Sequence, residues 1–288
     1  MDIPPGLGAL IAFIVGACVG SFVNTAAYRM PREVSLLRPR SFCPRCNRPI
    51  PRWANIPILA YIGLRGRCLM CGGPISFRYF LTELALASAA AWLYLSFPFV
   101  DALARFVLCT GLYIAALVDY DWRVIPNAIT FPGIPIGFIA AALAIPEVGW
   151  KGSLIGVTIG AGFLFITGEV YLLLRGSEGV GMGDVWLLGM VGAFLGWAGV
   201  LFTLFVGAIF GSIGGVVLAL TGGAPTPLEE VPAAIAEVTS QRRGDPLPAG
   251  GPAEATLLRT EVPFGPFIAL AAAAYALFQH QLAHWYFS

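Results

Sequence analysis

Two groups of residues in this sequence have types and spacings that could do chemistry: four cysteines, and carboxylates inside apolar segments. The cysteines form two Cys-x-x-Cys pairs, Cys43 with Cys46 and Cys68 with Cys71, separated by 21 residues. Each pair can give two thiolates to one tetrahedral zinc ion, and the spacing is close to that of zinc ribbons. The other interpretation is two disulfides or idle thiols. A closed four-thiolate site has no open coordination position, so the predicted zinc is structural.

The carboxylates are notable because a charged group at the centre of a membrane helix costs about 2.5–3.5 kcal/mol on insertion scales, and such groups tend to be functional. Asp119 ends one apolar segment, and Asp184 follows Gly181-Met182-Gly183 and opens another. Two carboxylates at one depth can share a proton, so that one activates water while the other protonates a carbonyl oxygen. Helix capping and a proton-relay pair stay open for both, because spacing alone does not decide.

Other carboxylates lie near these segments. Asp101 opens an apolar segment on the predicted outer side and is interpreted as a helix cap. Glu83 and Glu169 each lie a turn or two inside a predicted membrane boundary. For these two glutamates, a structural pairing with an arginine and a role in holding substrate are equally open.

The elements that carry these residues are predicted to lie in a membrane. Hydrophobic residues make up 58% of the 288 positions, charged residues 11%, and the mean hydropathy is +0.80. Soluble domains carry about 45–50% apolar and about 25% charged residues. A spanning helix needs about 20 mostly apolar residues. Runs of that kind occur near 7–28, 80–98, 102–118, 128–146, 152–174, 184–197, 198–221 and 264–287. The sequence therefore predicts an all-α polytopic membrane protein with about eight transmembrane helices.

Basic residues set the predicted orientation. Ten of the 17 basic residues lie between Arg29 and Arg78, against a single acidic residue. Short loops rich in Lys and Arg stay cytoplasmic, so segment 29–78 is predicted inside and the N-terminus in the periplasm. The cytoplasm keeps thiols reduced, which favours zinc over disulfides. Threading eight helices from there brings Asp119 and Asp184 to the same cytoplasmic face.

The chain divides into five predicted parts. They are a first transmembrane helix at 1–28, a small cytoplasmic zinc-binding module at 29–78, a transmembrane catalytic core at 79–221, a cytoplasmic insertion at 222–262 and a last transmembrane helix at 263–288. The insertion is rich in Pro, Gly, Ala and charge and lacks apolar periodicity, so it is predicted to be mobile.

An ordered set of motifs resembles a known family. In chain order these motifs are Gly20-Ser21-Phe22-Val23-Asn24, Tyr28-Arg29-Met30-Pro31, the two cysteine pairs with Asn55-Ile56-Pro57 and Arg65-Gly66-Arg67 between them, Ile75-Ser76-Phe77-Arg78-Tyr79, Glu83, Asp119 with Ile125-Pro126-Asn127, Gly181-Met182-Gly183-Asp184, and Val262-Pro263-Phe264-Gly265-Pro266-Phe267. The chain resembles, over nearly its whole length, the type IV prepilin peptidases, which are bifunctional leader peptidases and N-methyltransferases among the Gly-x-Gly-Asp intramembrane aspartyl proteases. A lone Gly-x-Gly-Asp would be weak support, whereas this ordered set is specific.

The resemblance implies an activity and a site. The family's catalytic aspartates carry over to Asp119 and Asp184, while Asp121 lies outside the catalytic register as a neighbour that tunes Asp119. Expected substrates are prepilins or pseudopilins, cleaved at the cytoplasmic face of the bacterial inner membrane after a Gly and usually before a Phe. The enzyme would then methylate the new N-terminal amine with S-adenosylmethionine, whose site the sequence does not place. Membrane lipid is the only other expected partner, with no nucleic acid.

Two departures from the family and several alternatives accompany this interpretation. The family usually has Lys two residues after the second aspartate, where this chain has Trp186, and the insertion at 222–262 is longer than is common. One alternative is a peptidase that does not methylate, although relatives of that type lack the zinc module. The others are a proton-coupled membrane transporter, which gives no reason for four cysteines, and a non-catalytic zinc-bearing scaffold.

Overall fold

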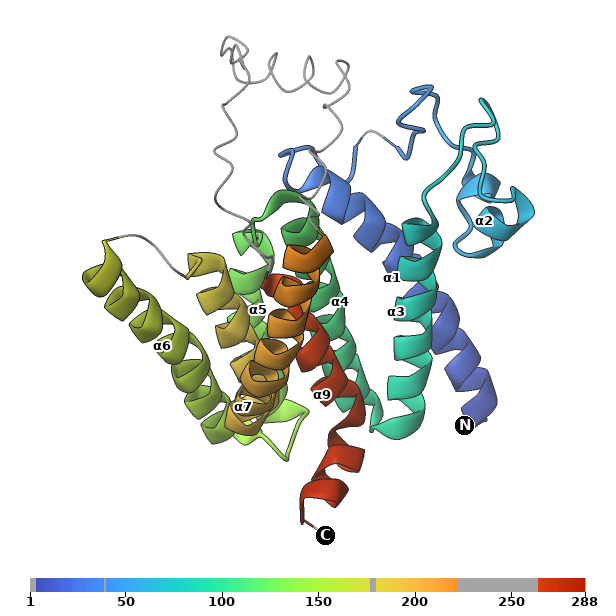
Figure 1. Cartoon of the computed structure of the whole chain (residues 1–288). Coiled ribbons are helices and arrows are strands. Elements are labelled where there is room, and N and C mark those ends of the chain that lie inside the picture. The colour runs from blue at the N-terminus through green and yellow to red at the C-terminus, as the bar shows by residue number, and fades with distance from the viewer. Residues whose placement is uncertain (1–3, 39, 177–179, 222–263, 288) are drawn as a thin grey trace.

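The computed structural model describes residues 4–38, 40–176, 180–221 and 264–287, so the predicted insertion at 222–262 lies outside the described residues. The described part is mostly helical (Figure 1). The helices are α1 (Pro5–Arg29), the short 3-10 helix η1 (Arg52–Asn55), α2 (Leu59–Gly63), α3 (Phe77–Ser96), α4 (Phe99–Trp122), α5 (Asn127–Leu143), α6 (Gly149–Arg175), α7 (Met182–Thr221) and α9 (Gly265–Phe287).

Four described helices, α1, α4, α6 and α7, are long and apolar enough to cross a membrane. Shorter apolar helices are α5 and the part of α9 from Gly265 to Gln279. The prediction of a helical membrane protein is therefore confirmed in its coarse form. The number of eight spans stays a prediction.

Helix α7 is interrupted at Gly196, whose φ of 69° and ψ of −172° are not helical. In Figure 1 the second half of α7 runs back beside the first, so the two halves form a helical hairpin. The hairpin packs on α6 through glycines, because a Cβ at Gly156 would lie 2.7 Å from the backbone carbon of Gly196. Small residues of this kind let helix backbones approach closely. The border predicted between residues 197 and 198 falls next to this break.

Two apolar clusters divide the bundle, and α4 contributes to both. One cluster joins α1, α3 and one side of α4, with Val23, Leu86 and Val118 among its buried members. The other joins α4 to α6, α7 and α9, with Leu112 and Leu188 among its buried members. We call α1, segment 30–76 and α3 the N-terminal unit, and α5, α6, α7 and α9 the C-terminal unit. Helix α4 is the joint between the two units.

A buried arginine ties α4 to α9. The Arg105 side chain is 0% exposed; its Nε donates to Asp101 Oδ1 at 2.7 Å, and its Nη1 donates to the Ala276 carbonyl at 3.1 Å and to Gln279 Oε1 at 2.7 Å. The N-cap of α4 is Pro98, and no side chain caps it. The interpretation of Asp101 as a cap is therefore wrong, because its carboxylate pairs with the guanidinium one turn further along the helix.

Candidate active site and metal centre

Asp119 lies in the last turn of α4, where its side chain meets the start of α9. The residue is 7% exposed, and its Oδ2 accepts a hydrogen bond from the backbone N–H of Gly265 at 3.0 Å. A Cβ on Gly265 would lie 2.6 Å from that oxygen, so only glycine allows this approach. Arg123 ends α4 in the left-handed conformation, with φ 57°, and its N–H donates to the Asp119 carbonyl at 2.9 Å.

Asp184 lies in the first turn of α7 and is half-buried. Its N–H donates to the Gly181 carbonyl at 3.0 Å, while Oδ1 is buried without a hydrogen-bond partner in the described chain. A Cβ on Gly183 would lie 2.8 Å from the Cβ of Ile125, so this glycine lets the loop after α4 pack on the start of α7. The ends of α4 and α7 that carry the two aspartates lie at one end of the bundle (Figure 1).

Trp186 contacts an aromatic residue of α5. Its ring lies edge-to-face against Phe131 of α5, with centroids 5.1 Å apart and an interplanar angle of 81°. The position where the resemblance expects a lysine therefore supplies a contact between α7 and α5.

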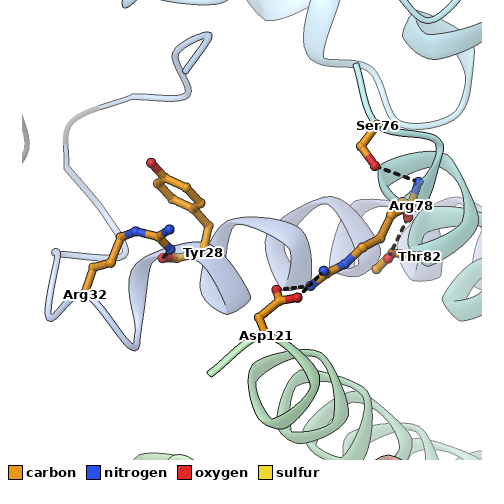
Figure 2. A network of polar contacts seen from close by, with 6 residues as sticks. All are labelled: Tyr28, Arg32, Ser76, Arg78, Thr82 and Asp121. Carbon is orange, nitrogen blue, oxygen red and sulfur yellow. Dashed lines mark hydrogen bonds and ion pairs between the residues drawn. The ribbon is translucent and has the colours of Figure 1, made fainter. Parts of the chain in front are cut away.

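Asp121 forms an ion pair with the N-terminal unit. Arg78 of α3 donates from Nη1 to Asp121 Oδ1 at 2.7 Å and from Nη2 to Oδ2 at 2.6 Å (Figure 2). In the sequence, Arg78 counts only toward the predicted membrane orientation and as a member of one family motif. Neither its place in a motif nor its charge indicates a partner 43 positions away.

The four cysteines converge on one point. Their Sγ atoms all lie within 4.8 Å of one another, and the Sγ atoms of Cys43 and Cys71 are 4.0 Å apart. Four sulfurs at about 2.3 Å from a tetrahedral zinc ion would be about 3.8 Å apart, so the set fits that metal. All four are free thiols rather than disulfides.

Two similar turns present these thiols. In the first turn, the Cys43 N–H donates to the Arg48 carbonyl at 3.0 Å; in the second, the Cys68 N–H donates to the Gly73 carbonyl at 2.8 Å. Each turn also needs one residue in the left-handed region, which is Asn47 with φ 52° in the first and a glycine with φ 67° in the second. Asparagine and glycine are the residues that adopt this conformation most readily. The metal site is thus built from local backbone geometry.

The thiols differ in acidity. Backbone N–H groups of Cys71 and Met70 lower the pKa of Cys68 to about 7, which favours its thiolate near neutral pH. Burial raises the pKa of Cys43 to about 11. Thiolates are the metal ligands, so binding of zinc must displace the proton of Cys43.

The two glutamates have different surroundings. Glu83 of α3 is buried, and its Oε2 accepts the N–H of Ile58 at 2.7 Å, which anchors the loop before α2. This contact favours the structural interpretation of Glu83, with a backbone N–H in place of an arginine. Glu169 is exposed on α6, and its carboxylate has no hydrogen bond or ion pair with the described residues.

Two family descriptions match consecutive parts of the chain. The bacterial peptidase A24 N-terminal domain matches residues 14–97, and the type IV leader peptidase family matches residues 106–216. The gap between the two matches falls at the start of α4, the joint between the two packing units.

Several curated proteins are similar to the chain. A prepilin leader peptidase/N-methyltransferase from Burkholderia pseudomallei is 35% identical over 76% of this chain and 79% of its own length. A protein of the same name from Myxococcus xanthus is 34% identical over 78% of this chain and 67% of its own, and one from Aeromonas hydrophila is 29% identical over 98% and 94%. No solved structure matches the chain.

Proposed function

The chain belongs to the type IV leader peptidase family, and from this premise we propose that it removes the leader from type IV prepilins or pseudopilins and then methylates the new N-terminal amine. Its curated relatives carry both activities in their names. The two matched regions together cover most of the N-terminal unit and most of the C-terminal unit.

The observation that supports the proteolytic half is that the end of α4 and the start of α7 lie at one end of the bundle, with Ile125 packed on Gly183 just before Asp184. One carboxylate activates water while the other protonates the carbonyl oxygen of the scissile peptide, and the proton then passes to the leaving amine. The Gly265 N–H fixes Oδ2 of Asp119, which leaves Oδ1 of Asp119 for the water. The unpartnered Oδ1 of Asp184 is available to the substrate. A peptide placed between them would fill that missing hydrogen bond.

The proposed orientation places the cysteine module in the cytoplasm and the aspartates at the cytoplasmic face of the membrane. The helices of Figure 1 alternate in direction along the described chain, and both marked ends of the chain lie at the end of the bundle opposite α2. With eight crossings, the N-terminus and the C-terminus are periplasmic. The arginine-rich module then faces the cytoplasm, in line with the positive-inside rule. The membrane is the bacterial inner membrane, where substrate enters as an apolar helix.

The proposed cofactors are zinc and S-adenosylmethionine. Cys43, Cys46, Cys68 and Cys71 hold a structural zinc ion, whose four thiolates leave no position for a substrate. S-adenosylmethionine supplies the methyl group when bound. The described residues do not assign its site.

One experiment separates the two halves of the proposal. The purified protein is incubated in lipid vesicles with a prepilin and labelled S-adenosylmethionine, and both leader removal and label transfer are followed. We expect both products. A prepilin whose Gly before the cleavage point is replaced by a bulky residue serves as the matched control and should stay intact. Cleavage without label identifies a peptidase that does not methylate, and a prepilin left intact refutes the proteolytic assignment.

A further inference from the structure

We propose that the Arg78–Asp121 ion pair positions Asp119, so that the order of the cysteine module is transmitted to the cleavage site through this pair. This inference rests on the proposed function, since it takes Asp119 as a member of the catalytic dyad. Arg78 is a positioning residue that acts through Asp121 and the last turn of α4.

The pair has a geometry that fixes orientation as well as distance. The two terminal nitrogens of the Arg78 guanidinium each donate to a different carboxylate oxygen of Asp121, at 2.7 and 2.6 Å (Figure 2). A planar fork of this kind resists rotation of either partner, which a lysine at the same position would not do. The side chains are 37% and 21% exposed, so the pair lies at the surface, between the N-terminal unit and α4.

On the α4 side, Asp121 and Asp119 belong to the same terminal turn. Side chains two positions apart on an α-helix point about 200° apart, so the two carboxylates face opposite sides of α4. Asp121 meets α3, whereas Asp119 meets α9. Helix ends fray unless they are held, and a rotation of this turn would move both side chains together.

On the α3 side, Arg78 is directly connected to the cysteine module. It lies in the first turn of α3, seven positions after Cys71. Ser76 caps this helix by accepting the Arg78 N–H at 3.4 Å (Figure 2). The Ile75 N–H, just before the helix, donates to the Gly66 carbonyl at 2.7 Å. The second cysteine turn therefore sets where α3 begins, and α3 sets where the guanidinium of Arg78 lies.

A second arginine of the N-terminal unit contacts the next residue of α4. The Arg32 guanidinium lies 3.9 Å from the ring centroid of Tyr28 and 4.7 Å from the ring of Trp122, and its Nη1 donates to the Tyr28 carbonyl at 2.7 Å. Cations prefer the face of aromatic rings. Two consecutive residues at the end of α4, Asp121 and Trp122, are thus held by the N-terminal unit.

The expected consequence is a change in rate rather than in folding. An exposed or half-exposed ion pair contributes little to global stability. In contrast, a displacement of a reacting group by about 1 Å can cost about 10²-fold in rate. Loss of the Arg78–Asp121 pair should therefore lower kcat for leader cleavage while KM and the folded state change little.

The test is a double-mutant cycle crossed with metal removal. We expect Arg78→Gln and Asp121→Asn each to lower kcat about tenfold, and the double variant to be no slower than the slower single variant. Removal of the metal by a chelator should lower kcat of the unaltered protein by a similar factor and leave the double variant unchanged. Arg52→Gln, which removes an exposed arginine of the same module, is the matched control and should keep both its kcat and its metal dependence.

Two further variants guard against a folding defect. Arg78→Lys keeps the charge without the fork and should give an intermediate kcat, and Arg78→Asp combined with Asp121→Arg should be faster than either reversal alone. All variants should retain the zinc content of the unaltered protein. Unchanged kcat in both Arg78→Gln and Asp121→Asn would overturn the inference, as would a further loss when the metal is stripped from the double variant. If the unaltered protein cleaves no prepilin, the proposed function itself fails.

Discussion

The cysteine centre and the aspartate pair are held in opposite ways. All four thiols come from one short stretch of chain, and hydrogen bonds inside each turn present them. Asp119 and Asp184 come from α4 and α7, 65 positions apart, and a third helix, α9, orients one of them. The first site is a property of local sequence, whereas the second exists only when the whole bundle is packed. Substitutions at the aspartates should therefore reduce the cleavage rate most, and substitutions at the cysteines should reduce it less.

The largest effect is expected at the aspartates themselves. Asp119→Asn and Asp184→Asn should each reduce leader cleavage by about 10³-fold or more, because an amide can neither take up nor deliver the proton that the pair exchanges. Cleavage of a purified prepilin is the measurement, and unchanged zinc content shows that the module has kept its fold. Asp121→Asn, with its milder loss, is the control from the same helix turn. Substantial cleavage by either dyad variant would remove that residue from the catalytic pair.

The next effect is expected at the helix that orients Asp119. A methyl group on Gly265 would lie 2.6 Å from Oδ2 of Asp119, so Gly265→Ala must displace the carboxylate or the start of α9. We expect a fall in kcat of about 10²-fold, since small misplacements of reacting groups carry such costs. Gly162→Ala in α6, where a Cβ meets nothing within 4 Å, should leave kcat unchanged. Equal activity of the two variants would mean that the Gly265 hydrogen bond does not orient the aspartate.

A smaller effect on cleavage, with a large effect on metal, is expected at the cysteines. Cys43→Ser should abolish zinc binding. It should lower kcat for cleavage only about tenfold, which is the loss expected when the Arg78–Asp121 pair no longer positions Asp119. Metal analysis should find about one zinc per chain in the unaltered protein. Cys18→Ser, an exposed cysteine of α1, should change neither quantity.

The pH dependence of this metal site has a definite sign. Thiolates bind zinc, and the pKa of Cys43 is raised to about 11, so protons compete with the metal increasingly as the pH falls. Zinc should be released on acidification and retained in mild alkali. A Cys43→Ser protein that retains its zinc, or an unaltered protein that is metal-free and fully active, would contradict the structural role.

The same contrast explains what the sequence could predict. The spacing of four cysteines predicts their convergence, because the ligands are local, and runs of apolar residues predict the helices and the break near Gly196. Apolar segments and charge bring Asp119 and Asp184 to one membrane face, but only the family resemblance favours a catalytic pair over helix caps or a proton relay. The contacts of Gly265 and Arg78 depend on which helices lie side by side, and periodicity carries no such information. Asp101 is a different case: its partner Arg105 lies four residues along the same helix, a spacing at which side chains meet and which the sequence displays.

The smallest effect is expected at a strained residue of the module. Ile58 has φ 64° and ψ −56°, a conformation that a β-branched residue rarely adopts. A tight turn, in which the Leu59 N–H donates to the Pro57 carbonyl at 2.6 Å, and the bond from the Ile58 N–H to Glu83 hold it there. Such conformations cost about 1–3 kcal/mol for residues other than glycine.

Ile58→Gly removes this strain and keeps the backbone N–H that Glu83 accepts, while the greater freedom of glycine in the unfolded chain offsets part of the gain. We expect a net stabilisation of the module of about 1 kcal/mol, measured by thermal unfolding with zinc bound, and a cleavage rate within about twofold of the original. Ile56→Gly is the matched control, because Ile56 has an ordinary φ of −71° and its replacement should only destabilise. If Ile58→Gly instead slows cleavage or methyl transfer, the strain serves the chemistry. The local site would then be coupled to the reaction by more than the Arg78–Asp121 pair.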